Sequence, residues 1–354
     1  MRTGGHAHST RSIAMVKVGV IGYGVIGQRL ADGAALQQDM ELVGVCDVAP
    51  TLSIRAMKEA GMPYKLYSGN ADLSAFKAAG IPISGSFDDL VQQCDILLDS
   101  APAGIGAKNK ETYAKYGKKA VFQGGESDSV ADVFFHGLVN YEKGVGADYL
   151  KLTSCNTTGF IRAVDCLDKA CGVEKVAITI IRREADPGDY HRGLTNMLLM
   201  EKAPSHQCVD LMHIMPHIHA TGILVHAPVT HGHIITLCAT PKKKISLADA
   251  EAAFRASDRI RVVTLDEGFR GNASFFRYAR DLGNKRADMY EIGLWKDSMV
   301  LSGDDIMFAI NIPQESITIP ETVDAVRAAM GMQKTGKEGV ALTNKYLGMG
   351  KWKA

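Results

Sequence analysis

Residues 16–27 of the 354-residue chain read VKVGVIGYGVIG, and this stretch determines the expected fold. The β-branched run VKVGVIG leads into a glycine-rich turn, and the helix-period segment YGVIGQRLADGAAL and the run MELVGVCD (40–47) follow. A strand, a glycine turn, a helix and a second strand in this order are typical of a parallel βαβ unit. We therefore predict that the chain begins with a parallel α/β sheet.

The same alternation continues to about residue 150. Helix-like segments are expected at 52–61, 71–79, 87–93 and 107–117, and strands at 95–100 and 119–123. Strands and helices that alternate in this way form a doubly wound, Rossmann-type parallel sheet with helices on both faces.

After Tyr149 the pattern changes. The apolar runs become longer and alternate in polarity, as half-buried antiparallel strands do; they are YLKLTS, VEKVAITIIRR, GILVHAPV, HIITLCAT, IRVVTL, MYEIGLW and MVLSGDDIMFAINI. Near residue 319 the chain turns helical again, with IPETVDAVRAAMG and then KEGVALTNKYLG, and these helices could pack on either part. The sequence thus predicts a second, α+β domain with a mostly antiparallel sheet.

The composition limits the possible partners. Hydrophobic residues make up 46% of the chain and charged residues 22%, which is ordinary for a globular protein. The net charge of +1 favours neither nucleic acid nor an anionic membrane surface, and no run of 18 apolar residues predicts a membrane span. Seven cysteines without CxxC spacing indicate a reducing compartment, so we expect a cytoplasmic protein that acts on small molecules.

The glycine motif predicts a dinucleotide site. Gly22, Gly24 and Gly27 lie between a strand and a helix, where backbone N–H groups can meet a pyrophosphate. Asp47 follows Gly27 by twenty residues and ends the second strand. A carboxylate there can accept a hydrogen bond from the ribose 2′-OH and would repel a 2′-phosphate, so NAD is preferred and NADP remains possible.

The segment Ser154-Cys155-Asn156-Thr157-Thr158-Gly159 lies between the strand YLKLTS and the helix-like segment FIRAVDCLDKA. A cysteine at a helix N-terminus lies near the positive end of the helix dipole, which favours the thiolate. Cys155 is therefore the candidate nucleophile. The other cysteines are expected to be buried core residues, with Cys208 the least clear of them.

Several motifs together resemble a known family. GYGVIG, QGGES (123–127), SCNTTG (154–159), RREADP (182–187), PSH (204–206), RDLG (280–283) and QESITIPE (314–321) are similar to the archaeal-type (class II) glyceraldehyde-3-phosphate dehydrogenases. The resemblance runs from about Val16 to near the C-terminus. It implies a cofactor domain at 15–153 joined by 319–354, a catalytic domain at 154–318, and a homotetramer. Residues 1–14 are expected to be a disordered extension.

The resemblance also assigns residues to the site. It implies that Cys155 is the nucleophile, that Val25, Ile26, Gly125 and Gln314 contact the cofactor, and that Arg183 contacts the cofactor or an anion. Ser154, Asn156, Thr157, His206 and Gln207 are assigned to the substrate.

The family carries its catalytic histidine in an HxH segment, so we expect His231 or His233 to be the general base. If the segment were extended, both imidazoles would share a face that could bind zinc, a reading we consider weaker. We therefore assign no metal site.

Two departures leave the substrate open. The family's HHGPD-like stretch reads His206-Gln-Cys-Val-Asp210 here, and its lysine-bearing segment reads Cys46-Asp47-Val48. The expected reaction is NAD(P)-dependent oxidation of glyceraldehyde 3-phosphate with inorganic phosphate to 1,3-bisphosphoglycerate, through a cysteine thioester. The alternatives are a dehydrogenase of another phosphorylated or acidic (semi)aldehyde, and a non-catalytic NAD-binding redox sensor.

Overall fold

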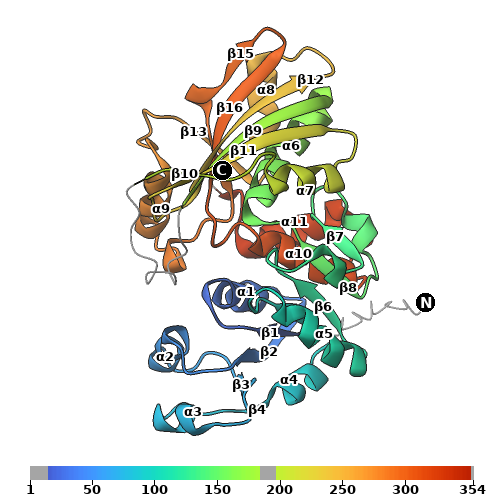
Figure 1. Cartoon of the computed structure of the whole chain (residues 1–354), viewed down its shortest axis with the longest axis vertical. Coiled ribbons are helices and arrows are strands. Elements are labelled where there is room, and N and C mark those ends of the chain that lie inside the picture. Colours follow the sequence, from blue (N-terminus) through green and yellow to red (C-terminus); the bar gives the residue numbers. More distant parts are fainter. Residues whose placement is uncertain (1–14, 184–196, 352–354) are drawn as a thin grey trace, which may run out of the picture.

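The strand at residues 16–21 forms the centre of a parallel sheet, sheet A, in the computed structural model, which describes residues 15–183 and 197–351 (Figure 1). The strand order is β4-β3-β2-β1-β5-β6-β8-β7, and every pairing is parallel. The strands are β1 (Val16–Ile21), β2 (Met40–Asp47), β3 (Leu66–Ser68), β4 (Gly85–Ser86), β5 (Ile96–Asp99), β6 (Lys119–Phe122), β7 (Val133–Phe135) and β8 (Tyr149–Leu152). The order reverses between β1 and β5, and such switch points are where doubly wound sheets bind ligands.

Helices connect these strands, which confirms the predicted Rossmann-type fold. They are α1 (Val25–Ala35), α2 (Leu52–Glu59), α3 (Ser74–Ala78), α4 (Phe87–Gln93) and α5 (Ile105–Lys115), with 3-10 turns η1 (Asp128–Val130) and η2 (Tyr141–Gly144). The expected extension at residues 1–14 lies outside the described residues.

The strand β8 corrects one prediction. We grouped YLKLTS with the antiparallel part of the chain, but β8 pairs in parallel with β6 and β7 of sheet A. The apparent polar alternation comes from Lys151, which is buried and forms an ion pair with Asp128 at 2.5 Å. A buried lysine gave this strand the pattern of a half-exposed one.

Sheet B lies above sheet A in Figure 1, and five of its seven described pairings are antiparallel. Its strands are β9 (Val173–Arg183), β10 (Leu199–Met200), β11 (His219–Ala227), β12 (His233–Pro241), β13 (Ile260–Val263), β14 (Ile292–Trp295), β15 (Val300–Ser302) and β16 (Asp305–Ile312). Its helices and turns are α6 (Cys155–Cys171), α7 (His206–Ile214), α8 (Leu247–Ala256), α9 (Asn272–Asp281), η4 (Lys285–Ala287) and η5 (Lys296–Ser298). The parallel pairs β9–β11 and β13–β14 were not predicted.

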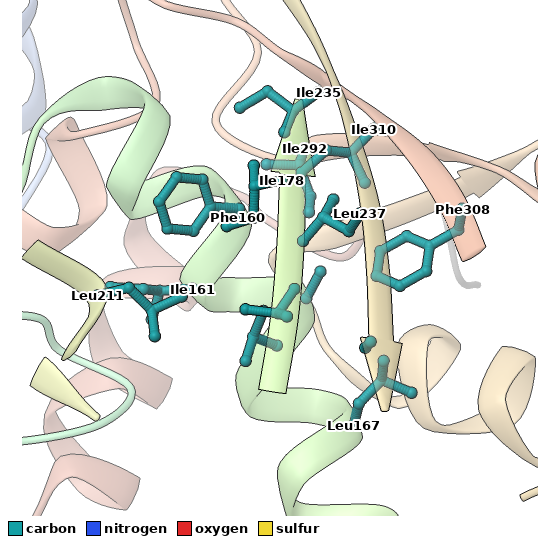
Figure 2. Packing of buried hydrophobic residues seen from close by; sticks show 14 of the residues in the cluster. Phe160, Ile161, Leu167, Ile178, Leu211, Ile235, Leu237, Ile292, Phe308 and Ile310 are labelled. Atoms are coloured by element: carbon teal, nitrogen blue, oxygen red, sulfur yellow. The ribbon is translucent and has the colours of Figure 1, made fainter. Parts of the chain in front are cut away.

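Helix α6 packs along one face of sheet B (Figure 2). Phe160, Ile161 and Leu167 follow helical spacing and contact the sheet around Ile178 of β9 and Leu237 of β12. Burying each such side chain contributes about 1.5–3 kcal/mol. This packing fixes the position of the helix N-terminus, where Cys155 lies.

The C-terminal helices α10 (Ile319–Ala329) and α11 (Gly336–Leu347) follow sheet B in the chain, and α10 packs against sheet A. Ile319 and Val323 belong to the same core as Val20 of β1 and Leu30 of α1. Helix α1 can approach α10 closely because Gly33 has no side chain. A Cβ at this position would lie only 2.7 Å from Ile319 Cγ2. Helix α10 is therefore buried along its whole length.

A buried ionic cluster joins α6 to α10. Glu321 accepts hydrogen bonds from Arg162 at 2.6 and 2.9 Å and from Arg259 at 2.9 Å, and Arg259 also pairs with Asp324 at 2.7 Å. Desolvation would raise the pKa of Glu321, but the two guanidinium charges outweigh it and lower the pKa to about 2. Burial lowers the pKa of the neighbouring His136 to about 4, so that ring is neutral. The cluster ties the helix that begins with Cys155 to sheet A.

Candidate active site

Cys155 is the first residue of α6 and is partly exposed. Ser154 is the N-cap: its Oγ accepts a hydrogen bond from the Thr157 N–H at 3.3 Å, and its carbonyl accepts from the Thr158 N–H at 2.8 Å. Ser154 and Thr157 also share a hydroxyl–hydroxyl bond of 2.9 Å. The sequence therefore places the sulfur at a capped helix start, where the dipole favours negative charge.

The structure brings His233 to this sulfur. Nε2 of His233 lies 3.8 Å from Sγ of Cys155, and the ring is completely buried at the start of β12. His231 instead is exposed; its Nδ1 contacts Thr230 Oγ1 at 2.7 Å and its ring packs on Phe276.

The extended HxH geometry that we considered for zinc is wrong at this segment. Gly232 has a φ of +66°, so the backbone is not extended and the two imidazoles do not share a face. A side chain on Gly232 would also lie 2.9 Å from the Ile312 carbonyl. No group of three or more His, Cys, Asp or Glu residues in 15–183 and 197–351 is arranged to hold a metal ion.

His233 is held from its other side by β9. Its Nδ1 accepts a hydrogen bond of 3.0 Å from the backbone N–H of Arg183. Burial lowers the pKa of His233 well below its usual value, and the positive charges of Arg183 and Arg182 lower it further. The imidazole is therefore neutral near pH 7.

The side chain of Arg183 is buried, whereas Arg182 is half-buried, as expected for neighbours on a strand. The Arg183 guanidinium donates to Glu315 at 2.9 Å and to the carbonyl of Thr230 at 3.1 Å. Glu315 also accepts from Arg29 of α1 at 2.6 Å, which links the site to the glycine-rich turn. The residues 184–187 of the RREADP motif lie outside the described residues.

The residues assigned to the substrate lie around α6 and α7. Thr157 is buried, and its Oγ1 is 3.4 Å from Asp210 Oδ2. His206 is exposed and lies close enough to Asp210 to affect its pKa, which burial raises overall. Gln207 is buried against the Ser205 hydroxyl, and Asn156 is buried as well. Thr157 and His206 are therefore brought together, whereas Gln207 points into protein.

The glycine-rich turn fits a dinucleotide. Gly22 has a φ of +82°, and a Cβ on Gly27 would lie 1.7 Å from the Gly22 carbonyl oxygen, so both positions require glycine. A Cβ on Gly24 would meet nothing within 4 Å, and this residue caps α1 without a side-chain hydrogen bond. The start of α1 at Val25 and Ile26 thus presents backbone N–H groups beside open space, as a pyrophosphate requires.

The remaining cofactor candidates border this region. Asp47 ends β2, and its carboxylate accepts hydrogen bonds from the N–H groups of Tyr23 at 2.9 Å and Val48 at 2.7 Å. Gly125 is exposed with open space at its Cβ position, and the neighbouring Gly124 lies against Ser154. Gln314 lines a small pocket together with Arg183 and His231.

Comparison with known proteins identifies the family. Residues 154–297 match the family model "Glyceraldehyde 3-phosphate dehydrogenase, C-terminal domain". The chain is 37% identical over 339 residues to glyceraldehyde-3-phosphate dehydrogenase 2 of Methanosarcina barkeri, covering 95% of this chain and 99% of the relative. The chain belongs to the archaeal-type glyceraldehyde-3-phosphate dehydrogenase family. The enzymes of Hyperthermus butylicus and Sulfolobus acidocaldarius are also 37% identical, with 95% of this chain and 98% of each relative covered.

Within this family fold, four of the other cysteines are buried, whereas Cys166 and Cys238 are only partly buried, which corrects the expectation that all six are core residues. Burial raises the pKa of Cys46 and Cys94 to about 12 and that of Cys208 to about 11. Those three thiols are protonated at neutral pH, as expected of core residues.

Sequence reasoning missed Asp210, Lys151 and Glu315 as neighbours of the site. Asp210 was visible only as the last residue of the altered stretch that begins at His206, and Glu315 only as the residue after Gln314. Their contacts depend on how β8, α7 and β16 come together, which no local pattern reveals.

Proposed function

We propose that this protein oxidises glyceraldehyde 3-phosphate with NAD and inorganic phosphate, giving 1,3-bisphosphoglycerate. The observation that carries the proposal is the Cys155–His233 pair at the start of α6, 3.8 Å apart. A thiol at a helix N-terminus beside a buried imidazole is an arrangement for nucleophilic attack on a carbonyl.

In the proposed reaction, Sγ of Cys155 attacks the aldehyde carbon and forms a thiohemiacetal. As the hydroxyl proton of the thiohemiacetal passes to a general base, the same carbon gives up a hydride, which a bound nicotinamide would accept, and a thioester remains on Cys155. Inorganic phosphate then attacks the thioester carbonyl and releases the thiolate as the acyl phosphate forms. The N–H groups at the start of α6 are the proposed donors to the oxyanion. The Thr157 N–H is not among them, because it already donates to Ser154 Oγ.

For the substrate, we propose that Thr157 and His206 face the phosphorylated aldehyde beside Asp210. Burial raises the pKa of Asp210, and the neighbouring basic side chains Lys151 and His206 partly offset this rise, so basic groups lie at the corner where the substrate is proposed to bind. A panel of aldehydes tests the substrate. Glyceraldehyde 3-phosphate is expected to give the highest kcat/KM, and a higher value for an acidic semialdehyde would replace the assignment.

For the cofactor, we propose a preference for NAD. Asp47 lies at the end of β2, where two backbone N–H groups fix its carboxylate, and a 2′-phosphate at the adenosine ribose would meet that charge. Two charges 4 Å apart at an effective dielectric of 20 repel by about 4 kcal/mol, and about a third of that gives tenfold discrimination.

Asp47→Ser is therefore expected to narrow the preference for NAD over NADP by about tenfold or more. The measurement is the ratio of kcat/KM for the two cofactors in wild type and variant. Asp72→Ser serves as a control and should leave the ratio unchanged. The Asp72 carboxylate is exposed, and among the described contacts it accepts hydrogen bonds only from Ser74. A wild type that favours NADP, or a ratio unaffected by Asp47→Ser, would show that Asp47 does not face the ribose.

We further propose a cytoplasmic homotetramer with the cofactor domain at 15–153 and 319–354 and the catalytic domain at 154–318. The face of sheet B away from α6 exposes Ile181, Ile223 and Met307 by 36 to 40%, which suits a subunit contact. Within the described part of the chain, no helix is long and apolar enough to cross a bilayer.

A further inference from the structure

We propose that Glu315 is a positioning residue for hydride transfer, because it joins the helix that begins at the glycine-rich turn to the strand that ends at Arg183. Its carboxylate accepts hydrogen bonds from Arg29 of α1 at 2.6 Å and from Arg183 of β9 at 2.9 Å. The proposed cofactor contacts lie on the α1 side of this bridge, and Cys155 lies on the side of sheet B. The inference rests on the proposed function for its reaction, whereas the bridge itself can be tested in the protein alone.

Arg29 is the centre of the bridge. Its guanidinium donates from Nη1 to the Val25 carbonyl at 2.7 Å, from Nε to Asp288 at 2.7 Å and from Nη2 to Glu315 at 2.6 Å. The donors of a guanidinium have a fixed planar geometry, so three contacts at once determine the orientation of the side chain. Val25 is the first residue of α1, and Arg29 therefore fixes the start of the helix against the catalytic part of the chain.

The contacts continue beyond Arg29 as a chain of alternating charges. Asp288 also pairs with Arg286 at 3.6 Å, and Arg286 pairs with Asp32, which lies on α1 three residues after Arg29. Helix α1 is thus held at two positions by residues of the catalytic part. In order, the members of this charge chain are Arg183, Glu315, Arg29, Asp288, Arg286 and Asp32.

The backbone next to this charge chain has an unusual conformation. Arg286 and Ala287 both have a φ of +56°, in the left-handed region that residues with a side chain seldom adopt. Such a conformation persists only where the surrounding structure holds it. Here Arg286 is held by Asp32 and Asp288, and Ala287 packs on the buried cluster that contains Phe275. The contacts with α1 therefore determine the shape of this segment.

Burial makes the charge chain sensitive to position. The exposed fractions of its six side chains lie between 3 and 23%. Buried ion pairs add little net stability because desolvation offsets their attraction, but a buried charge that loses its partner is costly. A shift of α1 relative to sheet B would separate at least one of these pairs. The charge chain therefore favours one distance between α1 and sheet B.

That distance matters for the proposed reaction. In the hydride step, the thiohemiacetal carbon on Cys155 loses a hydride to the oxidised nicotinamide while its hydroxyl proton passes to the base. The start of α6 fixes the carbon, and the start of α1 is the proposed site of the cofactor pyrophosphate. A misplacement of about 1 Å between reacting groups can slow a reaction by about 10²-fold. Glu315 acts on this step through Arg29 and Arg183, without contact to the sulfur.

Glu315→Gln tests this role, because the variant keeps the size of the side chain and removes its charge. Single-turnover hydride transfer is expected to fall by about 10- to 100-fold. The dissociation constant for NAD and the rate at which iodoacetamide alkylates Cys155 in the protein without NAD should stay within about threefold of wild type, since α1 and α6 each remain intact. A merely structural role would not separate these three quantities.

Asp281→Asn is the matched control. Its carboxylate is 62% exposed on α9 and pairs with Arg277 at 3.7 Å, so all three quantities should remain near those of wild type. Hydride transfer within about threefold of wild type in Glu315→Gln would overturn the proposal. A parallel fall in the alkylation of Cys155 would also overturn it, because Glu315 would then act through the cysteine.

A double-mutant cycle of Arg29→Met and Glu315→Gln tests the bridge itself. If the two residues act as one unit, the double variant should transfer hydride about as fast as Arg29→Met alone, and the two should have the same urea midpoint of unfolding. Losses that multiply, or midpoint shifts that add, would overturn the proposal. Arg29→Lys keeps the charge but cannot make the three contacts, and it replaces Arg29→Met in the cycle if that variant does not fold.

The proposed function can fail separately. A wild type that transfers no hydride from glyceraldehyde 3-phosphate would refute that function, and the urea cycle on the protein without NAD would still decide whether Glu315 and Arg29 form one bridge.

Discussion

Cys155→Ser is expected to lower turnover by more than about 10³-fold while cofactor affinity stays within about twofold of wild type. The helix start and the buried His233 are arranged to favour a thiolate, and a serine hydroxyl is far less ionised at neutral pH. The glycine-rich turn and Asp47, which carry the proposed cofactor contacts, are unaffected by the change. Steady-state rates and NAD titration by fluorescence measure the two quantities.

Cys166→Ser is the matched control because Cys166 lies on the same helix, eleven residues further on, and is also partly exposed. Its turnover should remain within about threefold of wild type, because Cys166 is not placed at the reacting sulfur. Substitutions at partly exposed positions of this kind usually change the free energy of unfolding by no more than about 0.5 kcal/mol. Equal losses in the two variants, or appreciable activity in Cys155→Ser, would remove Cys155 from the role of nucleophile.

Glu321→Gln is expected to lower the free energy of unfolding by about 3–5 kcal/mol, the usual cost of breaking a buried ion pair from one side. The substitution leaves the guanidinium groups of Arg162 and Arg259 buried without the carboxylate that both contact. In the wild type, the pKa of Glu321 is lowered from 4.5 to about 2, so its contribution is present above about pH 4.5 and is lost as the pH falls toward 2. Urea unfolding at pH 7 measures the difference.

The control is Asp304→Asn, which breaks the ion pair of Asp304 with Lys244 at 3.0 Å, where both side chains are largely exposed. An exposed pair of this kind contributes about 0–1 kcal/mol, so the variant should unfold near the wild-type midpoint. If Glu321→Gln were as mild as Asp304→Asn, the buried cluster would not hold α6 to α10.

Much of sheet A could be predicted because its strands and helices carry local signals. The glycine turn after β1 and the apolar runs of β5 and β6 each predict their own element, and the observed ends of the predicted elements lie within three residues of the expected ones. The polarity pattern grouped β8 with the antiparallel strands because it contains Lys151, which is buried. The ion pair with Asp128 explains how a lysine can be buried in this strand. The parallel pairing of β11 with β9 depends on the crossover through α7, which no local pattern encodes.

The site could be predicted only to the level of candidates. The position of Cys155 follows from a strand that precedes a helix, but His231 and His233 are equivalent until the φ of Gly232 separates them. The contact of the Arg183 amide with His233 joins residues fifty positions apart through the register of sheet B. Such contacts arise from tertiary structure, so composition and spacing cannot reveal them.

The measurement that tests the central claim most directly is nicotinamide reduction by the wild type with glyceraldehyde 3-phosphate and NAD, with and without inorganic phosphate. Without phosphate, the thioester on Cys155 should accumulate, giving a burst of about one reduced nicotinamide per subunit and then little further reduction. Adding phosphate should convert the burst into continuous turnover. Continuous reduction at the same rate without phosphate, or no reduction under either condition, would contradict a phosphorylating dehydrogenase that works through Cys155.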